Sequence, residues 1–480
     1  MKKLIKIIVL VSTLSPIFSC TEKNIDAEKP GKNEGQEPTT NCIQSQSKGP
    51  ITLNLQAITT TTATFDSVLD VEQMSNYQEV GFIYSTINEM DIEASHITKI
   101  KISKNIASTT LTHLLRETQY YYTVYLQKNG VYLYGDTQSF TTPFDGNLSV
   151  EEPANCYIIN HSGEYRFQTT KGNSNEVVGN VSSAAVIWES FGTETTPSIG
   201  DLIKECSYKD GFIYFETAAT FKEGNALIAA KDADDNILWS WHIWLTDQPQ
   251  GQVYYNTAGT MMDRNLGATS ATPGDVGALG LLYQWGRKDP FMGSSSISRD
   301  MTAKSTITWP STVSSNSSYG TITYATAHPT TFITGNSSSN YDWYYTGDKA
   351  TDNTRWATSS STKSIYDPCP AGWRVPDGDG SGVWSKALGS SSSFGHTYSS
   401  TNKGINFPGK FGTDATIWYP ASGYRNSSTG ILYDIGYQGN WWSASPTSYE
   451  ACHLAFETTA VAPAKISSRA CGFSVRCIKE

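Results

Sequence analysis

The chain has 480 residues, which at roughly 150 residues per domain corresponds to about three domains. Aromatic residues make up 12% and charged residues 17% of it, a composition typical of a folded protein with packed cores. The formal net charge is −10 and lysine and arginine are not clustered, which argues against a nucleic-acid partner. Beyond the first 20 residues no apolar run approaches the roughly 20 residues of a membrane helix, so we do not expect a polytopic membrane protein.

Residues 1–19 have the pattern of a signal peptide, with a short basic start, an apolar middle and the small Ser19 at the end. The cysteine that follows resembles the lipobox of bacterial lipoproteins, which implies that Cys20 is acylated and starts the mature chain. Thr21, where an aspartate would retain a lipoprotein at the inner membrane, implies the outer membrane. We therefore expect a protein anchored by lipid at the cell surface, with an ordinary secretory signal as the alternative.

Residues 20–48 contain charges of both signs, Pro30 and Pro38, and almost no large apolar side chain. Such a segment cannot bury enough apolar surface to offset the entropy of ordering the chain. We predict a flexible tether between the lipid and the first domain.

Residues 49–143 contain short runs of β-branched and aromatic residues separated by polar turns, which predicts a β-sandwich. The segment from Leu114 to Thr142 resembles the final strands of fibronectin type III domains. That resemblance implies that Tyr120 forms the tyrosine corner, with Phe65 where the family has a tryptophan. Alternation assigns half of the tyrosine-rich strand to the core, and a binding face is the alternative. We expect this domain to act as a spacer.

Residues 147–248 repeat the rhythm of short strands and predict a second, immunoglobulin-like sandwich. The run from Ile237 to Trp244 is apolar at both odd and even positions, which face opposite sides of a strand. We therefore expect an interior strand that is covered on both faces. Within this run, His242 is expected to be a hydrogen-bonded core residue, although a metal ligand is the alternative.

Residues 251–480 are rich in glycine, serine and threonine, and residues 253–480 contain nine of the thirteen tryptophans. Five ordered motifs resemble the FISUMP family (the major paralogous domain) of bacterial surface lipoproteins. They are Met262–Ala268, Gly280–Phe291, Asp367–Pro376, Trp441–Ser445 and Gly472–Cys477. The resemblance implies an α+β, C-type-lectin-like fold with few helices and long ordered loops, and it implies recognition rather than a known chemistry. The predicted fold class is therefore mainly β: two sandwiches followed by this domain.

The eight cysteines include no Cys-x-x-Cys pair and no spacing suited to zinc. The family motifs imply a disulfide between Cys369 and Cys477. We predict a second bridge between Cys452 and Cys471, which lie on what we expect to be neighbouring strands. Two further cysteines, Cys156 and Cys206, are candidates for a third bridge, which leaves Cys42 unpaired.

The common catalytic motifs are absent from the sequence: it has no HExxH, no GxSxG and no phosphate-binding glycine loop. We expect a protein that is not an enzyme and has no cofactor. The alternation of Asp377 and Asp379 among glycines resembles the start of a calcium loop, but Leu388 stands where the closing acid belongs. A glycine-rich turn that caps a helix is the other interpretation.

Aromatic and polar residues gather after a loop rich in serine and threonine, in a pattern typical of sugar recognition. These candidate ligand-binding residues are Tyr341, Asp342, Trp343, Tyr344 and Trp356. A loop packed by its own aromatic side chains is the alternative. We expect a lipid-anchored adhesion protein that binds a glycan or a surface protein. The alternatives are a structural or tip component of a fimbria-like assembly, contacting through a strand edge, and an enzyme on a lectin-like scaffold.

Overall fold

The computed structural model describes most of the chain from Leu53 to Glu480. The parts outside the description are residues 1–52, 60–61, 68–75, 93, 95–96, 102–107, 113, 115–117, 143–146, 151, 255, 310, 346, 348–351, 360–361, 389–397 and 408–416. The predicted signal peptide (1–19), the acylated Cys20, the tether (20–48) and Cys42 lie outside the described residues. Within the described ranges, no helix has both the length and the apolar character needed to cross a bilayer.

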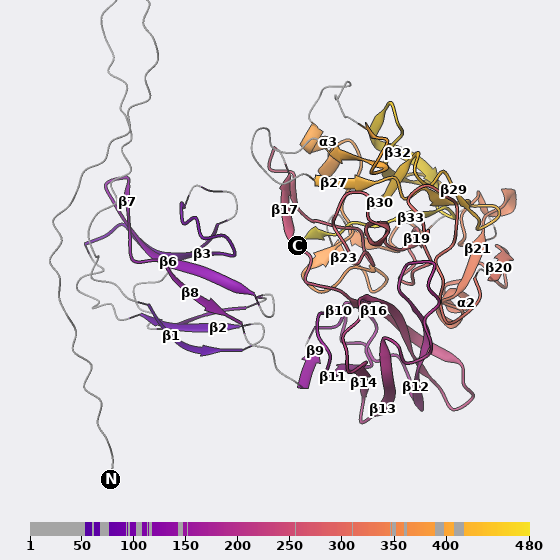
Figure 1. Ribbon diagram of the computed structural model, residues 1–480, viewed down its shortest axis with the longest axis horizontal. Helices are drawn as coiled ribbons and strands as arrows, with labels where there is room; N and C mark the ends of the chain where they lie inside the picture. The colour runs from indigo at the N-terminus through magenta and orange to yellow at the C-terminus, as the bar shows by residue number, and fades with distance from the viewer. Residues whose placement is uncertain are drawn as a thin grey trace, which may run out of the picture. The chain divides into compact units, whose positions relative to one another are not determined.

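Residues 53–142 form two antiparallel sheets (Figure 1). One sheet has the order β1-β2-β5, and the other has the order β4-β3-β6-β7, with β8 also paired to β6. The strands are β1 (Leu53–Ile58), β2 (Ala63–Ser67), β3 (Glu79–Ser85), β4 (Thr98–Lys101), β5 (Ser108–Leu111), β6 (Gln119–Lys128), β7 (Val131–Tyr134) and β8 (Gln138–Thr141). This region is called the first sandwich below.

The core of the first sandwich is aromatic. Phe65 on β2 lies 4.8 Å from the Tyr122 ring and 5.7 Å from the Phe140 ring, measured between centroids. Tyr120 is also buried and stacks on Phe140 at 5.4 Å. Alternate residues of β6 thus enter the core, which confirms the prediction that the tyrosine-rich strand packs inward.

Residues 147–245 form two four-stranded sheets with the orders β10-β16-β15-β12 and β13-β14-β11-β9. Their strands are β9 (Asn147–Val150), β10 (Cys156–Ile159), β11 (Glu164–Gln168), β12 (Ser183–Ser190), β13 (Ile203–Lys209), β14 (Phe212–Thr217), β15 (Gly224–Lys231) and β16 (Ile237–Leu245). As predicted, β16 is an interior strand, paired with β10 and β15 and buried from Trp239 to Leu245.

The two faces of β16 contribute to different cores. Trp239, Trp241 and Ile243 pack against the facing sheet, whereas Trp244 packs against residues from the C-terminal half of the chain. His242, between them, is buried and lies 2.8 Å through Nε2 from Asn225 Oδ1. Burial lowers the pKa of His242 to about 3, so the ring is neutral at physiological pH. The expectation of a hydrogen-bonded core histidine is confirmed.

Residues 251–480 contain one seven-stranded sheet, in which β29-β28-β33-β30-β31-β32 are neighbours and β19 pairs with β33. A four-stranded sheet, β17-β18-β34-β24, pairs the first strands of this segment with its last. Smaller sheets are formed by β20-β21, by β22-β23 and by β25-β26-β27.

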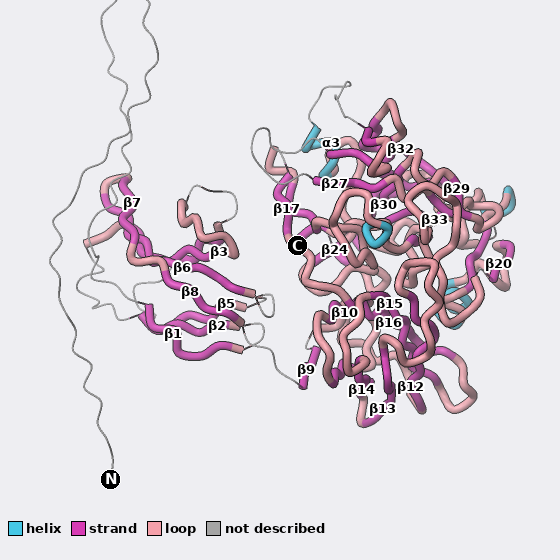
Figure 2. Tube along the Cα trace, in the orientation of Figure 1, coloured by secondary structure: helices cyan, strands magenta, loops and turns pink. Residues whose placement is uncertain are grey.

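The strands of this segment are β17 (Gly251–Tyr254), β18 (Gly259–Met262), β19 (Leu282–Gln284), β20 (Ser311–Ser314), β21 (Thr331–Thr334), β22 (Ala357–Ser359), β23 (Thr362–Lys363), β24 (Trp373–Arg374), β25 (Tyr398–Ser399), β26 (Gly404–Phe407), β27 (Ile417–Pro420), β28 (Tyr424–Arg425), β29 (Leu432–Tyr433), β30 (Gly439–Pro446), β31 (Glu450–Phe456), β32 (Val461–Ser468), β33 (Gly472–Ser474) and β34 (Ile478–Lys479). Its helices are α2 (Ile322–Ala327), α3 (Val383–Leu388) and the 3₁₀ turns η1 (Val276–Ala278) and η2 (Ser337–Ser339). Strand and loop dominate the described chain, as Figure 2 shows, so the fold is mainly β.

The second sandwich and the C-terminal segment share a hydrophobic core. One cluster joins Trp188 and Trp244 of the sandwich to Trp285 and Trp442 of the later segment. The Asn155 side chain also donates to the carbonyl oxygens of Ile365 (2.7 Å) and Asp367 (2.8 Å). We call residues 147–480 the C-terminal body, because its two halves are packed on one continuous core.

Candidate functional site

The residues predicted to bind a ligand lie mostly in the interior. Trp343 is 1% exposed, and Asp342 and Trp356 are fully buried. Tyr344 is half-buried, and Tyr341 alone of the five is exposed, at 51%. The prediction of a sugar-binding face is therefore wrong for Asp342, Trp343 and Trp356, and the alternative of a self-packed loop describes them.

A buried charge cluster explains why this loop turns inward. Arg355 donates to both carboxylate oxygens of Asp342, at 3.2 and 2.6 Å, and Arg469 lies 3.7 Å from the same carboxylate. The Arg355 guanidinium also lies 4.8 Å from the Trp343 ring and 4.9 Å from the Trp285 ring. Burial, together with the charge of Arg355, lowers the pKa of Arg469 to about 10. Asp342 and Trp343 thus anchor the loop rather than present it.

The two aspartates of the suspected calcium loop have local partners. Asp377 accepts a hydrogen bond from Arg374 at 2.9 Å, and Asp379 accepts from the backbone and hydroxyl of Ser381. The described residues contain no group of three or more acidic, histidine or cysteine side chains that could hold a metal ion. The turn that precedes α3 is closed by main-chain bonds, from the Val383 N–H to the Asp377 carbonyl at 2.9 Å and from the Gly382 N–H to the Asp379 carbonyl at 3.0 Å.

The cysteine predictions divide into one success and two failures. Cys369 and Cys477 form the disulfide that the family motifs imply, across a sequence separation of 108 residues. Cys452 and Cys471 are free, because Cys452 lies opposite Ile466 in the β31–β32 ladder while Cys471 follows in a turn.

The thiols of Cys156 and Cys206 are free as well, because they belong to different cores. Cys156 packs in the cluster shared with the C-terminal segment, and Cys206 packs in the interior of the second sandwich. Burial raises the pKa of both thiols, which makes them inert rather than reactive.

A group of tyrosines on the hairpin β28–β29 and the turn after it provides the exposed aromatic surface that the 341–356 loop lacks. Tyr437 is 63% exposed and Tyr433 40% exposed, and the adjacent Ile431 is 54% exposed. Tyr424 lies opposite Tyr433 in the hairpin, with their rings stacked at 6.1 Å. We call Tyr424, Tyr433 and Tyr437 the tyrosine surface.

The backbone under the tyrosine surface is held from the interior by Arg425, which is 1% exposed. Its guanidinium donates to the carbonyl oxygens of Met292 (2.9 Å) and Gly430 (2.6 Å) and to the hydroxyl of Thr302 (3.2 Å). Tyr398 adds a bond from its hydroxyl to the Gly436 carbonyl. The rings are therefore displayed on a backbone that is already fixed, which lowers the entropy cost of binding.

Charged groups border the tyrosine surface. Lys403 Nζ lies 6.0 Å from the Tyr437 ring centroid. Asp300 accepts a hydrogen bond from the Ile435 backbone at 3.0 Å, and burial together with the Asp300 charge raises the pKa of Asp434. Sugars bind well to flat aromatic faces that have basic and acidic hydrogen-bonding groups beside them.

The sequence contains a signal for this surface that motif reasoning missed. Asn426-Ser427-Ser428-Thr429-Gly430 is a turn between two short runs that contain tyrosine, a typical hairpin pattern. Gly430 has φ +69°, and its N–H bonds to the Asn426 carbonyl. The pattern predicts a hairpin, although it does not show which of its rings are exposed.

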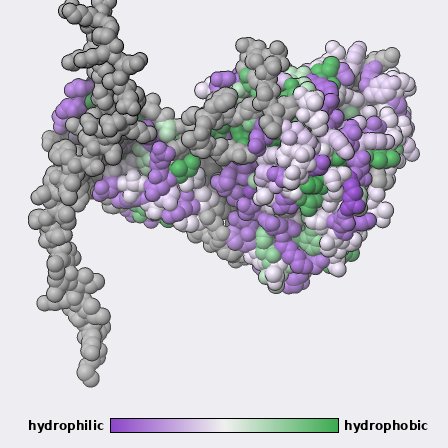
Figure 3. All heavy atoms as spheres, turned by 45° about the horizontal axis from the view of Figure 1, so that its top comes forward, coloured by the Kyte–Doolittle hydropathy of each residue, from purple (hydrophilic) through white to green (hydrophobic). Residues whose placement is uncertain are grey.

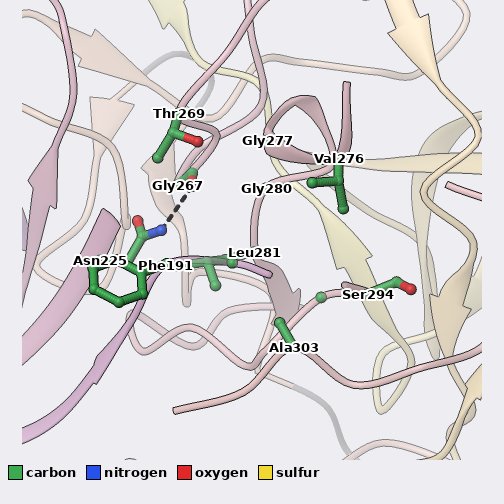
Figure 4. A pocket seen from close by; sticks show the side chains of 12 residues that line it. Phe191, Asn225, Gly267, Thr269, Val276, Gly277, Gly280, Leu281, Ser294 and Ala303 are labelled. Carbon is green, nitrogen blue, oxygen red and sulfur yellow. Dashed lines mark hydrogen bonds between the residues drawn. The ribbon is translucent and has the colours of Figure 1, made fainter. Parts of the chain in front are cut away.

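A small hollow lies where the second sandwich meets the C-terminal segment (Figure 4). Asn225 reaches across this junction and donates to the Gly267 carbonyl at 2.9 Å. Two of the glycines in its wall are required by close contact between loops. A Cβ at Gly293 would lie 2.3 Å from the Gly280 carbonyl, and one at Gly280 would lie 2.9 Å from the Leu266 carbonyl. These glycines permit chain packing, so we assign no ligand to this hollow.

No family model matches the chain, and no curated protein matches its sequence. Solved structures match over about a fifth of it. A fibronectin type III domain of human collagen alpha-1(XX) is 18% identical, with 22% of this chain and 91% of that chain covered and a TM-score of 0.17. One of human contactin 1 is 15% identical, with 23% and 95% covered and a TM-score of 0.17. A redesigned β-sandwich protein is 22% identical, with 19% and 90% covered and a TM-score of 0.16. The functional argument therefore rests on the site.

Proposed function

We propose that this protein is a non-enzymatic lipoprotein of the cell surface, whose C-terminal body binds a glycan through the tyrosine surface. The observation that carries the proposal is the exposure of Tyr433, on the hairpin held by Arg425, and of Tyr437, in the turn after it. Exposed aromatic rings on a fixed backbone offer apolar faces to the C–H patches of a sugar ring, at little cost in conformational entropy. The neighbouring Lys403 and Asp434 provide hydrogen bonds for hydroxyl groups.

Features of the rest of the chain support this proposal. Residues 1–20 have the signal and cysteine pattern of a lipoprotein. The strand order of the first sandwich and the aromatic core around Phe65 are in keeping with a fibronectin type III-like spacer.

Within the C-terminal body, the mixed seven-stranded sheet, the short helices and the long ordered loops are what a FISUMP, C-type-lectin-like domain implies. In this proposal the first sandwich is a spacer and the body is the binding module.

A glycan array tests the binding site. The mature chain without its lipid (residues 21–480) is compared with Tyr437→Ala, Tyr433→Ala and the control Tyr449→Ala. Tyr449 is 48% exposed but lies between β30 and β31, outside the tyrosine surface. We expect the first two variants to weaken binding by about tenfold, the loss of one stacked ring, and the control to bind normally. Binding that survives in both variants, or no glycan bound at all, would contradict the proposal.

The location is tested separately, by fractionating cells that carry Cys20→Ala. We expect the wild-type chain in the membrane fraction and the variant in the soluble fraction, because acylation requires the thiol. Equal partitioning of both chains would remove the lipid anchor from the proposal.

A further inference from the structure

Two carboxylates from separate segments lie beside the rings of the tyrosine surface. Asp434 directly follows Tyr433 in the chain, and its side chain is exposed. Asp300 is also exposed, and its Oδ1 accepts a hydrogen bond from the backbone N–H of Ile435 at 3.0 Å. Because Ile435 is the residue after Asp434, the loop that carries Asp300 brings its carboxylate to the same turn.

The surface around Asp434 has a negative potential. Partial burial raises the pKa of Asp434, and the charges of Asp300 and Glu457 raise it further. Burial likewise raises the pKa of Tyr424, and the charges of Asp434 and Asp300 add to that effect. Of these acids, Glu457 has a basic partner, Lys465, at 3.7 Å. A cationic group placed beside Asp434 would offset the remaining repulsion.

Neither of the two aspartates is neutralised from within the described residues. Asp300 and Asp434 form no ion pair with a lysine, arginine or histidine that the structure describes. Arg299 precedes Asp300 in the chain, but its Nη2 lies 2.9 Å from Glu194 Oε1 instead. Exposed carboxylates are hydrated and need no partner for stability. These two are, however, free to accept charged hydrogen bonds from a ligand, which are stronger than neutral ones.

The rings beside these carboxylates also suit a cation. The negative face of an aromatic ring attracts an ammonium group within about 6 Å of its centroid. Lys403 already makes such a contact, because its Nζ lies 6.0 Å from the centroid of the Tyr437 ring. Tyr433 and Tyr437 are both exposed. A ligand can therefore place a cationic group against a carboxylate and a ring at once.

We infer that the tyrosine surface selects sugars that carry a protonated amino group. In this arrangement Asp434 and Asp300 accept hydrogen bonds from the ammonium, while Tyr433 and Tyr437 stack on the C–H patches of the sugar ring. The inference rests on the proposed function and specifies its ligand. A neutral sugar would make the ring contacts but would leave both carboxylates without a counter-charge.

The test compares a short oligosaccharide of glucosamine with the same oligosaccharide of N-acetylglucosamine, which has the same ring and linkage but an uncharged amide. Calorimetry at about pH 6, where carboxylates are ionised and amines protonated, gives both affinities for residues 21–480. We expect the amine form to bind about tenfold more tightly, and this preference to disappear in Asp434→Asn, as for the loss of a charged hydrogen bond. Binding of the acetylated form should not change in this variant.

The variant and its control are chosen to leave the fold intact. Asp434 has φ +59°, and asparagine adopts this left-handed conformation as readily as aspartate does. The matched control is Asp234→Asn, which removes an exposed carboxylate from the turn between β15 and β16, outside the tyrosine surface. The control should keep the preference for the amine. Tyr437→Ala should weaken the binding of both oligosaccharides.

Several outcomes would overturn the inference. Equal affinity for the two oligosaccharides would do so while leaving the proposed function in place, and so would a lysine tripeptide that binds as tightly as the amine form. A preference that survives in Asp434→Asn, or that is lost equally in Asp234→Asn, would show a general attraction of cations to an acidic chain. Failure of both oligosaccharides to bind would also contradict the inference, whereas the proposed function fails only when no glycan of the array binds.

Discussion

The first sandwich and the C-terminal body differ in how deeply the ion pairs of their described residues are buried. In the first sandwich, Glu79 lies at the sheet surface between Lys99 and Lys101, whose side chains are 39% and 67% exposed. In the C-terminal body, Arg355 and Asp342 form an ion pair that is 0% exposed on both sides. On the face seen in Figure 3, hydrophilic and hydrophobic residues are interspersed.

The contrast shows that the two regions are stabilised differently. The core of the first sandwich consists of apolar and aromatic side chains, and burial of those side chains stabilises it. The C-terminal body has long loops whose backbone carbonyls need partners once they are buried, and buried arginines supply them. Arg469, for example, donates to the carbonyls of Glu450, Asp352 and Thr447. Folding of the body therefore depends on contacts between segments far apart in sequence.

The largest effect is expected from dividing the chain. Residues 49–143 and residues 147–480 should each fold alone, whereas residues 251–480 should not, because Trp188 and Trp244 of their shared core would be missing. Circular dichroism and thermal unfolding of the three purified fragments check this. A cooperative transition in the 251–480 fragment would show that its core is complete without the second sandwich.

A smaller but still large effect is expected from Asp342→Asn. The change leaves Arg355 and Arg469 buried without a counter-charge, so we expect a loss of about 3–5 kcal/mol in the free energy of unfolding of the C-terminal body. Denaturant unfolding measures the loss.

The matched control for this variant is Glu194→Gln, which removes the partner of Arg299 in a surface pair that is 52% and 62% exposed. It should change stability by less than about 1 kcal/mol. Equal effects of the two changes would show that the interior cluster adds nothing beyond a surface ion pair.

The smallest effect concerns the first sandwich and acid. Hydrogen bonds from Lys99 and then Tyr125 lower the pKa of Glu79 from 4.5 to about 2. A carboxylate whose pKa is depressed on folding stabilises the fold above its unfolded pKa and loses that contribution as the pH falls. We expect the 49–143 fragment to lose about 1 kcal/mol between pH 4.5 and 2 because of this group, since its lysine partners are partly solvated.

Unfolding of the 49–143 fragment at several pH values, with Glu79→Gln as control, measures this contribution. The variant should lack this part of the acid dependence. Identical pH profiles for the two fragments would rule the contribution out.

The sequence predicts the strands better than the site, for physical reasons. A strand buried on one face has alternating apolar residues, as β6 does, and a strand buried on both faces is apolar at every position, as β16 nearly is. Both patterns are local, so the sequence predicts both strands. Composition led to the wrong expectation for Trp343, because a loop rich in serine and threonine gives no sign that another loop covers it. The covering loops are held by arginines that donate to backbone carbonyls. Every residue has a backbone carbonyl, so the sequence does not show which carbonyls an arginine will bond.

The tyrosine surface and the free thiols show the same limit. Tyr433 differs from Tyr120 only in which side of its sheet is covered, and that depends on tertiary packing. Cys452 and Cys471 are close in sequence, but a disulfide needs side chains that point toward each other, which strand order alone does not determine. The bridge between Cys369 and Cys477 was predicted from a resemblance of the segments around them, and not from their spacing.

Because Arg425 holds its hairpin through the backbone, the ligand specificity of this surface can change without a change of scaffold. Its bond to the Gly430 turn is accepted by a main-chain oxygen, a group that every amino acid offers. The side chain of Ser428, which bonds to the turn through its backbone N–H, can therefore be exchanged while the scaffold beneath it keeps its shape. A library randomised at Ser428 would explore new ligands at little risk to folding, whereas Thr429 should be kept because its hydroxyl bonds within the turn.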